Sequence, residues 1–285
     1  MLLRRGIRCS STQAKKLVSA YFEKPKPSSS PLGEDALFIA PNACGVADGV
    51  GGWKAENIDS GVYSRSLMKN CQSVLDRQPN ITAGDLLQQA AKEVVEGTFG
   101  TCTACILTTD LAQNKAQVVN LGDSRFVYLR KSSLASIKGD GTVGGWQVVG
   151  QTRDQTWDFN APFQIGKYPP GYAIDKVYTA NDADVYDINS VQPHDLFVLA
   201  TDGVFDNVFI KDMVQICNKV DKQAKNSSPE HFVSLLAEQI GQHSLACAKK
   251  EVGETPFSKY AKENGWMFLG GKMDDISVVV SLVVG

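Results

Sequence analysis

The segment Cys44-Gly45-Val46-Ala47-Asp48-Gly49-Val50-Gly51-Gly52-Trp53 (residues 44–53) joins a short apolar run to an Asp-Gly pair and two further glycines. The apolar run has the length and composition of a β-strand, so Asp48 stands where the chain leaves a sheet. A glycine after the carboxylate lets the backbone approach an ion closely, so that a carbonyl oxygen can also be a ligand. The segment therefore predicts a strand end that presents oxygen ligands to a cleft.

Carboxylates recur in four other short segments, most of them beside apolar runs that are typical of strands. They are Gly33-Glu34-Asp35-Ala36, Asn120-Leu121-Gly122-Asp123-Ser124-Arg125, Ala200-Thr201-Asp202-Gly203 and Met273-Asp274-Asp275-Ile276-Ser277. Taken singly, each Asp-Gly or Gly-Asp pair is better explained as a turn. If the five segments converge, they form an acidic pocket that needs compensation by divalent cations such as Mg²⁺ or Mn²⁺. Such a pocket with two metals is typical of phosphoryl hydrolysis.

The composition limits the classes of function. The chain has 285 residues, 43% of them apolar, and a formal net charge of −2, which is typical of one large globular domain. The first 22 residues hold five basic groups and no acid, so the remainder is mildly acidic and offers no basic stripe for nucleic acid. No apolar run approaches the length of a membrane span.

The N-terminus differs from the rest of the chain. Residues 1–22 are rich in Arg, Ser and small residues, which predicts a mitochondrial transit peptide, with a disordered basic tail as the alternative. Residues 23–31 are rich in Pro and Ser and are interpreted as a linker. The folded domain is accordingly expected over residues 32–285.

The seven cysteines show no framework spacing. Cys102 and Cys105 form a C-x-x-C pair, but they lie in a β-rich run, where positions three apart point to opposite faces. All seven are therefore expected to be reduced thiols in a reducing compartment, mostly in the core.

The pattern of apolar residues predicts an α+β fold with two antiparallel sheets packed together and helices outside them. Helices are expected at residues 58–76, 83–95, 211–220, 229–248 and 256–264. Strands are expected at residues 36–40, 44–47, 103–109, 115–121, 125–130, 173–178, 184–188, 196–200 and 276–284. Residues 138–145 are glycine-rich and are expected to form a loop.

In this order the chain carries an acidic pair, D-G-x-G-G, a small-residue G-[ST]-x-x-A strand at residues 100–104, N-x-G-D-S-R, A-T-D-G followed by two hydrophobic residues and Asp, and D-[DN]-hydrophobic-[ST]. This series resembles the metal-dependent protein phosphatases, the type 2C serine/threonine phosphatases, over about residues 33–285. A finer resemblance, to a mitochondrial branch of that family, rests on residues 45–53, 160–164, 206–207 and 270–275.

The resemblance implies a β-sandwich with helices on both faces, in four αββα layers, and a binuclear metal site at one edge. Asp48 would bridge two Mn²⁺ or Mg²⁺ ions. Glu34 and the carbonyl of Gly49 would hold one ion, and Asp202 and Asp274 the other. Asp48, Asp202 and Asp274 are thereby the implied catalytic residues.

The same resemblance assigns outer positions. Asp35 would act on a metal through water, Asp123 together with Asp202 would bind a weaker third ion, and Asp206 would lie outside the ligands. Four further motif residues are interpreted as structural: Thr201, Ser124, Arg125 and Asp275.

Two departures from the family pattern concern the substrate. Many relatives carry a His, a proposed general acid, where this chain has Val50, which cannot donate a proton. Many also carry an Arg shortly before the acidic pair, where residues 30–32 are Ser-Pro-Leu. Lys24 and Lys26 are the nearest basic residues, and the sequence does not place either of them at the site.

The resemblance implies a phosphoserine/phosphothreonine protein phosphatase of the mitochondrial matrix that uses a metal-activated bridging water on phosphoprotein substrates, and a monomer is expected. The alternative is a pseudophosphatase that keeps the fold as a regulatory binding module. The complete set Glu34, Asp48, Asp202 and Asp274 favours the enzyme, because a lapsed enzyme should have lost at least one ligand. A purely structural metal domain fits poorly, because the implied ligands leave positions open for water.

Overall fold

Two five-stranded antiparallel sheets lie face to face in the computed structural model, which describes residues 14–27, 31–132, 145–174 and 176–285. The first sheet has the strand order β1 (Lys16–Lys24), β14 (Ile276–Val284), β13 (Leu196–Ala200), β7 (Arg125–Lys131) and β8 (Trp146–Gln151). The second has the order β12 (Asp184–Ile188), β6 (Lys115–Leu121), β5 (Ala104–Asp110), β3 (Ala43–Asp48) and β2 (Asp35–Ala40).

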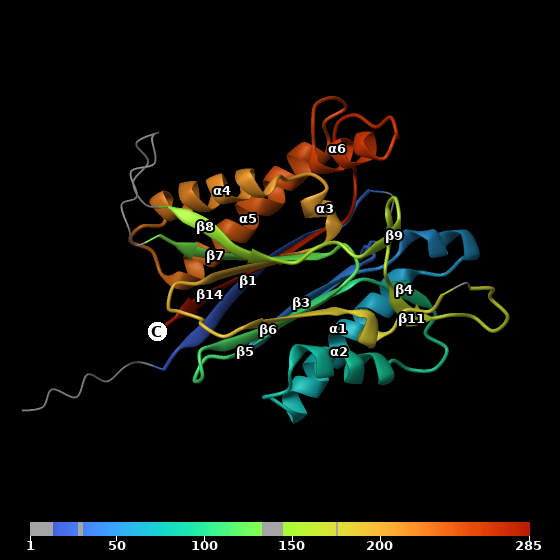
Figure 1. The fold of residues 1–285 in the computed structure, drawn as a ribbon, viewed down its shortest axis with the longest axis horizontal. Coiled ribbons are helices and arrows are strands. Elements are labelled where there is room, and N and C mark those ends of the chain that lie inside the picture. The colour runs from blue at the N-terminus through green and yellow to red at the C-terminus, as the bar shows by residue number, and fades with distance from the viewer. Residues whose placement is uncertain (1–13, 28–30, 133–144, 175) are drawn as a thin grey trace, which may run out of the picture.

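Helices cover the outer faces of both sheets (Figure 1). The first sheet carries α4 (Ile210–Gln223) and α5 (Pro229–Ala248), and the second carries α1 (Ser60–Arg77) and α2 (Ala83–Lys92). The shorter elements are η1 (Gly51–Glu56), β4 (Gly100–Cys102), β9 (Thr156–Asp158), β10 (Ala161–Pro162), β11 (Ile165–Lys167), η2 (Ala180–Asp182), α3 (Asp202–Phe205) and α6 (Pro256–Glu263). This confirms the expected α+β fold in four αββα layers.

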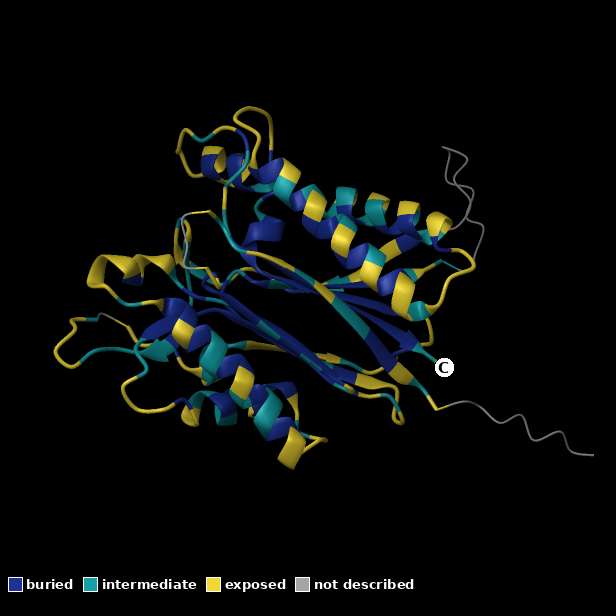
Figure 2. Cartoon of the chain, turned by 180° about the vertical axis from the view of Figure 1, so that it is seen from behind, coloured by how far each residue is buried: buried dark blue, intermediate teal, exposed yellow. Residues whose placement is uncertain are grey.

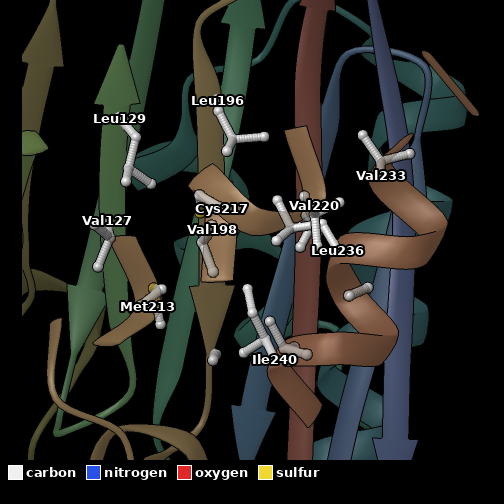
Figure 3. Packing of buried hydrophobic residues seen from close by; sticks show 14 of the residues in the cluster. Val127, Leu129, Leu196, Val198, Met213, Cys217, Val220, Val233, Leu236 and Ile240 are labelled. Carbon is white, nitrogen blue, oxygen red and sulfur yellow. The ribbon is translucent and has the colours of Figure 1, made fainter. Parts of the chain in front are cut away.

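Three apolar layers hold the elements together, because alternate residues of a strand point to opposite faces of its sheet. In β7, Val127 and Leu129 face α4 and α5, as Figure 3 shows, whereas Phe126 and Tyr128 lie between the two sheets. The third layer fills the space between the second sheet and α1 and α2. Burial on both faces explains why the central strands are buried almost throughout (Figure 2).

The helices begin where the sequence supplies capping residues. The side chains of Asp59, Thr82 and Ser228 accept backbone N–H groups at the starts of α1, α2 and α5. These bonds satisfy donors that a helix start leaves unpaired. Pro229 at the first position of α5 has no N–H to satisfy.

Many predicted elements are confirmed, and those at residues 115–121, 184–188, 196–200, 229–248 and 276–284 match at both ends. The strand predicted at residues 173–178 is wrong, because the described residues there form no strand beyond a bridge between Ile165 and Tyr178. The ring of Tyr178 instead stacks on Phe163, with 4.1 Å between the ring centroids. Strand β8 was not predicted, and most of the loop predicted at residues 138–145 lies outside the described residues.

The expected domain boundary at residue 32 is also wrong. All nine residues of β1 pair with β14, so residues 16–24 belong to the first sheet rather than to a transit peptide or a linker. Leu17 is buried between the two sheets, and Val18 is buried under α5. β1 contains Lys, Ser and Ala, as the preceding N-terminal residues do. Composition therefore does not distinguish this strand from the segment before it. Residues 1–13 lie outside the described part of the chain.

Within the described residues, no helix is long and apolar enough to cross a lipid bilayer. Six of the seven cysteines are described, and all six are buried and unpaired. Cys102 packs toward α1 and α2, whereas Cys105 packs between the sheets, which confirms that the two thiols face opposite ways.

Candidate metal centre

The second sheet contributes carboxylates from the open end of the β2–β3 hairpin. The register of the hairpin places Asp35 opposite Asp48. One residue further, the N–H of Gly49 donates to the carbonyl of Glu34 over 3.0 Å. A Cβ at Gly49 would lie 2.7 Å from that carbonyl oxygen and 2.9 Å from Ser60, so no larger residue fits without movement. The hairpin thus gathers three acidic residues and a close backbone at one sheet edge.

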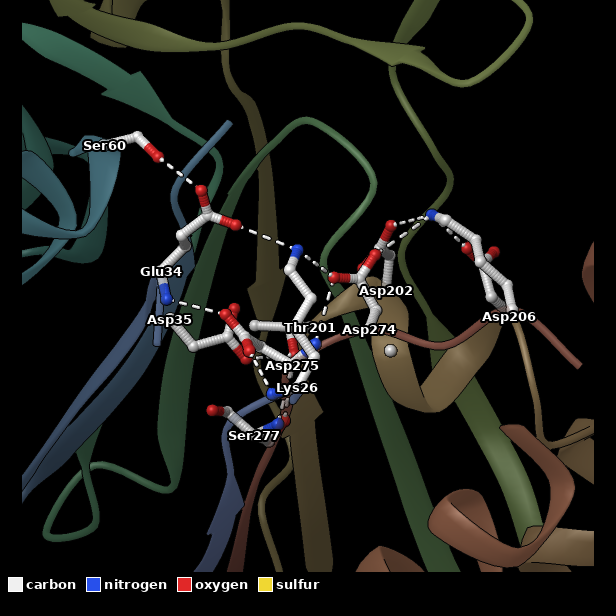
Figure 4. Close-up of polar contacts among 12 residues, drawn as sticks. Lys26, Glu34, Asp35, Ser60, Thr201, Asp202, Asp206, Asp274, Asp275 and Ser277 are labelled. Atoms are coloured by element: carbon white, nitrogen blue, oxygen red, sulfur yellow. Dashed lines mark hydrogen bonds and ion pairs between the residues drawn. The ribbon is translucent and has the colours of Figure 1, made fainter. Parts of the chain in front are cut away.

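The first sheet contributes carboxylates at the same edge, from the end of β13 and the start of β14. Thr201 continues the pairing, because its N–H donates to the carbonyl of Ser277 over 3.0 Å. A Cβ at Gly203 would lie 1.9 Å from the carbonyl oxygen of Asp275. Glycine at this position therefore lets Asp202 and Asp274 approach each other (Figure 4).

Lys26 connects the two sheets at this edge. Its ammonium nitrogen lies 2.9 Å from Oε2 of Glu34 and 2.8 Å from Oδ1 of Asp274 (Figure 4). Glu34 and Asp274 are far apart in the sequence. Because both contact the same ammonium group, their carboxylates lie within a few ångströms of each other. Burial opposes the charge of Lys26, but Asp274 and Glu34 outweigh it and raise the pKa of the lysine.

Lys272 pairs with the carboxylates that follow β13 and precede β14. Its ammonium nitrogen lies 2.6 Å from Asp202, 2.7 Å from Asp206 and 3.4 Å from Asp274. Asp48 lies within hydrogen-bonding reach of Asp202. The structure therefore brings together Glu34, Asp48, Asp202 and Asp274 as the sequence predicts, and it adds Asp206 to the same cluster.

The negative charge of the carboxylate cluster exceeds the positive charge of the two lysines beside it, and the pKa values of the carboxylates reflect this. Burial, followed by Asp35 and Asp202, raises the pKa of Asp48. Burial and the charge of Asp202 likewise raise the pKa of Asp123 and of Asp274. Burial raises the pKa of Asp206 to about 7. In contrast, burial would raise the pKa of Asp202, but the ammonium of Lys272 outweighs it and lowers the value.

Three buried carboxylate oxygens at this edge accept no hydrogen bond from any described residue: Oδ1 of Asp35, of Asp123 and of Asp202. Buried polar atoms are normally satisfied, so each unsatisfied oxygen indicates a missing partner. Because the surrounding groups are carboxylates, a cation would satisfy these oxygens and also offset the negative charge. Hard carboxylate oxygens around an acidic cavity fit Mg²⁺ or Mn²⁺.

The side chains as they stand do not yet form a closed ligand set. Among the described residues, no three His, Cys, Asp or Glu side chains surround a common point as ligands of one ion would. The ammonium groups of Lys26 and Lys272 lie between the carboxylates and take the place of a cation. Binding of a metal at this edge would therefore require both lysine side chains to turn aside.

The residues that were expected to be structural have partners of their own. Asp275 accepts the N–H groups of Lys26 and Glu34, both over 2.6 Å. Thr201 donates its hydroxyl to Asp35 over 2.8 Å. Two further pairs are the hydroxyls of Ser124 and Thr103, 2.7 Å apart, and the guanidinium of Arg125 with both oxygens of Asp154.

Sequence reasoning missed both lysines at this site. Lys26 reaches the metal edge only because β1 joins the first sheet and carries the chain past β14. Lys272 stands two residues before Asp274, and that spacing was the available signal. The side chain of Asn207 fixes its backbone by pairing with both the N–H and the carbonyl of Lys272, over 3.0 and 2.8 Å.

Comparison with known proteins gives a consistent result, although no family model matches the chain. It is 33% identical over 264 residues to the protein phosphatase PTC7 homolog of Danio rerio, covering 88% of this chain and 81% of the relative. It is 32% identical over 263 residues to the PTC7 homolog of Homo sapiens, with 88% and 79% covered. A probable protein phosphatase 2C 55 of Arabidopsis thaliana is 33% identical over 279 residues, with 95% and 53% covered.

Solved structures share the fold. The photosystem II phosphatase PBCP superposes with a TM-score of 0.75 and 25% identity, over 93% of this chain and 98% of the other. The catalytic domain of the serine threonine protein phosphatase PstP, solved with two manganese ions, has a TM-score of 0.59 and 18% identity, over 95% and 100%. The identity to the PTC7 homologs over most of both chains shows that this chain belongs to the type 2C family of serine/threonine protein phosphatases, among the PTC7 homologs.

Proposed function

We propose that this chain removes phosphate from phosphoserine and phosphothreonine in proteins, with two Mn²⁺ or Mg²⁺ ions bound at the acidic edge of the sandwich. The observation that carries the proposal is the convergence of carboxylates from both sheets with buried oxygens that lack a donor. The two manganese ions of PstP, which has the same fold, support this choice of cofactor.

The ligand assignment follows the arrangement of the strand ends. Glu34 and the Gly49 carbonyl lie on the second sheet and would hold one ion, whereas Asp202 and Asp274 lie on the first sheet and would hold the other. Asp48 lies within reach of Asp202 and opposite Asp35, and would therefore bridge the two ions. Bound there, the ions would supply an activated water for attack on phosphorus and would neutralise the phosphoryl oxygens.

Two outer assignments extend this set. Asp35 holds one oxygen on the hydroxyl of Thr201 and leaves the other without a donor, which suits an interaction with a metal through water. The unsatisfied oxygen of Asp123, together with Asp202, would hold a weaker third ion.

The protein groups around the ions position the phosphate and handle protons. Lys26 is the cation nearest to Glu34 and Asp274, and once these bind metal its ammonium would face a phosphoryl oxygen. It would thus replace the Arg that many relatives carry before the acidic pair. Val50 has no proton to give, so the leaving serine or threonine oxygen would take its proton from water.

The experiment that tests this function is hydrolysis of p-nitrophenyl phosphate and of a phosphothreonine peptide by the full chain. We expect turnover with Mn²⁺ and none with excess EDTA. Turnover that persists in EDTA would contradict the metal mechanism. A folded protein that binds Mn²⁺ without turnover would instead identify a pseudophosphatase.

We further propose that the protein acts on mitochondrial proteins. The support is the basic, acid-free segment upstream of β1, together with the resemblance of the motifs to a mitochondrial branch of the family. Residues 1–15 fused to a fluorescent protein are expected to direct it to mitochondria, because β1 begins at Lys16. Fluorescence that stays in the cytosol would contradict the proposal that residues 1–15 target the protein to mitochondria.

A further inference from the structure

A cavity of about 550 Å³ opens beside the metal centre, and the family motifs do not account for it. Its lining includes Val50 and Gly52, which lie two and four residues after Asp48 in the chain. Its walls are mostly aromatic: Trp53, Trp157, Tyr168, Tyr172 and Tyr178. We call this cavity the aromatic subsite.

Hydrogen bonds tie the aromatic subsite to the residue that would bridge the metals. The N–H of Thr103 donates to the carbonyl of Asp48 over 2.9 Å, and the N–H of Val50 donates to the carbonyl of Thr101 over 2.9 Å. The hydroxyl of Thr101 in turn accepts the indole N–H of Trp53 over 2.6 Å. Thr101 lies on β4 and Thr103 follows this strand two residues later, so these bonds fix the wall of the cavity relative to Asp48.

Most of the walls are aromatic, and Gln164 and Lys176 add polar groups. The ring centroids of Tyr172 and Tyr168 lie 4.9 and 5.5 Å from that of Trp53. The ammonium of Lys176 lies 4.5 Å from the ring centroid of Tyr178, so its charge is directed at an aromatic face. Exposed aromatic side chains that cluster on a surface are typical of binding sites, and Trp157 and Tyr172 are 62% and 44% exposed.

We propose that the aromatic subsite binds an apolar side chain of the substrate protein, close in sequence to the phosphorylated residue. This inference rests on the proposed function, because the metal centre fixes where the phosphate lies. An extended chain advances about 3.3–3.6 Å per residue, so Val50 lies within about 7 Å of Asp48 along the backbone. A substrate residue one or two positions from the phosphorylated residue therefore reaches the cavity. Aromatic walls, with the ammonium of Lys176 directed at the ring of Tyr178, favour leucine or proline there over a charged side chain.

The test uses the full chain with Mn²⁺ and three phosphothreonine peptides that differ only at the two positions on each side of the phosphorylated residue. These positions hold leucine, glycine or glutamate. We expect kcat/KM for the leucine peptide to exceed that for the glycine peptide by about tenfold, as one well-filled apolar pocket allows. Equal values for leucine and glycine, or a preference for glutamate, would overturn the inference.

Two variants locate the preference in the aromatic subsite. Tyr172→Ala removes a wall, whereas Gly52→Leu fills the cavity from a position where an added Cβ meets no atom within 4 Å. Both are expected to bring the leucine-to-glycine ratio to within about twofold. The matched control is Trp266→Ala, which removes an aromatic side chain that is 61% exposed and lies outside this lining, and it should keep the ratio.

Failure of the proposed function is distinguishable in the same experiment. If the wild-type chain hydrolyses neither p-nitrophenyl phosphate nor any peptide with Mn²⁺, the phosphatase assignment fails and the inference fails with it. If p-nitrophenyl phosphate is hydrolysed and the ratio stays near tenfold in both subsite variants, the enzyme stands and only the aromatic subsite is rejected.

Discussion

Strand β13 has a buried aspartate at each end, and the two differ in their partners. Asp195 precedes the strand and is fully buried. Its carboxylate accepts the hydroxyl of Tyr128 over 2.6 Å, two N–H groups of Arg130 over 2.6 and 2.8 Å, and the N–H of Gln192 over 2.7 Å. Asp202 follows the strand, and its Oδ1 accepts no hydrogen bond from the described residues.

The difference is between a carboxylate that the fold satisfies and one that we propose as a metal ligand. The chain surrounds Asp195 with donors, including a guanidinium, so this carboxylate is satisfied by the fold itself. Asp202 instead has one cation, the ammonium of Lys272 on Oδ2, which it shares with Asp206 and Asp274, and its Oδ1 has no donor among the described residues. One ammonium balances several carboxylates here, which leaves room for further positive charge. Both aspartates are buried, so burial does not distinguish them. The number of hydrogen-bond donors around each carboxylate does distinguish them.

The largest expected effect comes from Asp48→Asn, which tests the ligand end of the comparison. Loss of the bridging carboxylate is expected to lower kcat/KM for p-nitrophenyl phosphate by at least about a hundredfold. In EDTA the variant should be no less stable than the wild type to urea, because it loses a carboxylate that burial and its acidic neighbours disfavour. Near-wild-type turnover would show that Asp48 does not bridge the metals.

Asp195→Asn makes the same chemical change at the satisfied end and should act in the opposite way. Removing the charge leaves Arg130 without its ion pair, and we expect the free energy of unfolding to fall by about 3 kcal/mol, measured with urea. Turnover per folded molecule with Mn²⁺ should stay unchanged, because none of its partners touches the metal edge. If Asp195→Asn kept its stability and lost its activity, Asp195 would not be a structural carboxylate, and the contrast with Asp202 would fail.

How far the sequence predicts this molecule depends on the kind of signal. Apolar runs of strand length predict β13 and β14 at their observed bounds, and the Asp-Gly pairs predict that Asp48 and Asp202 lie at strand ends. These signals are local, since each is complete within about ten residues. The convergence of the segments is not local, and it was available only through the resemblance to a known family.

The failures concern residues whose role depends on distant partners. β1 lies where the sequence predicts a transit peptide and a linker, because its composition does not indicate a strand without β14 beside it. Lys26 then had no expected position, although it lies between Glu34 and Asp274. The strand expected at residues 173–178 is wrong for a related reason, because Tyr178 stacks on the distant Phe163 and forms only a single bridge, with Ile165.

The pH dependence of the metal-free protein sharpens the comparison further. The folded state raises the pKa of Asp206 from 3.8 to about 7, chiefly through burial, so it holds a proton that the unfolded chain releases. This contribution to stability is present below about pH 4 and is lost as the pH rises toward 7. In EDTA, the free energy of unfolding of the wild type should therefore fall by about 3 kcal/mol more than that of Asp206→Asn between pH 4 and pH 7.

Urea unfolding at a series of pH values measures this difference, and parallel curves for the two proteins would contradict it. Saturating Mn²⁺ serves as the control. Metal binds the deprotonated ligands, so it should remove the loss of stability toward neutral pH in the wild type.

The smallest expected effect separates two roles of Lys26. If its ammonium binds the substrate phosphate once Glu34 and Asp274 hold metal, Lys26→Met should raise KM for p-nitrophenyl phosphate about fivefold and leave kcat within about twofold. If Lys26 only balances those carboxylates, KM should stay constant and Mn²⁺ should bind more tightly, because a competing cation has gone. Lys24→Met is the matched control, since Lys24 is exposed and ends β1 two residues before Lys26. Kinetics at saturating Mn²⁺, together with a Mn²⁺ titration, distinguish the two roles. An unchanged KM with tighter Mn²⁺ binding would show that the metals bind the substrate phosphate without Lys26.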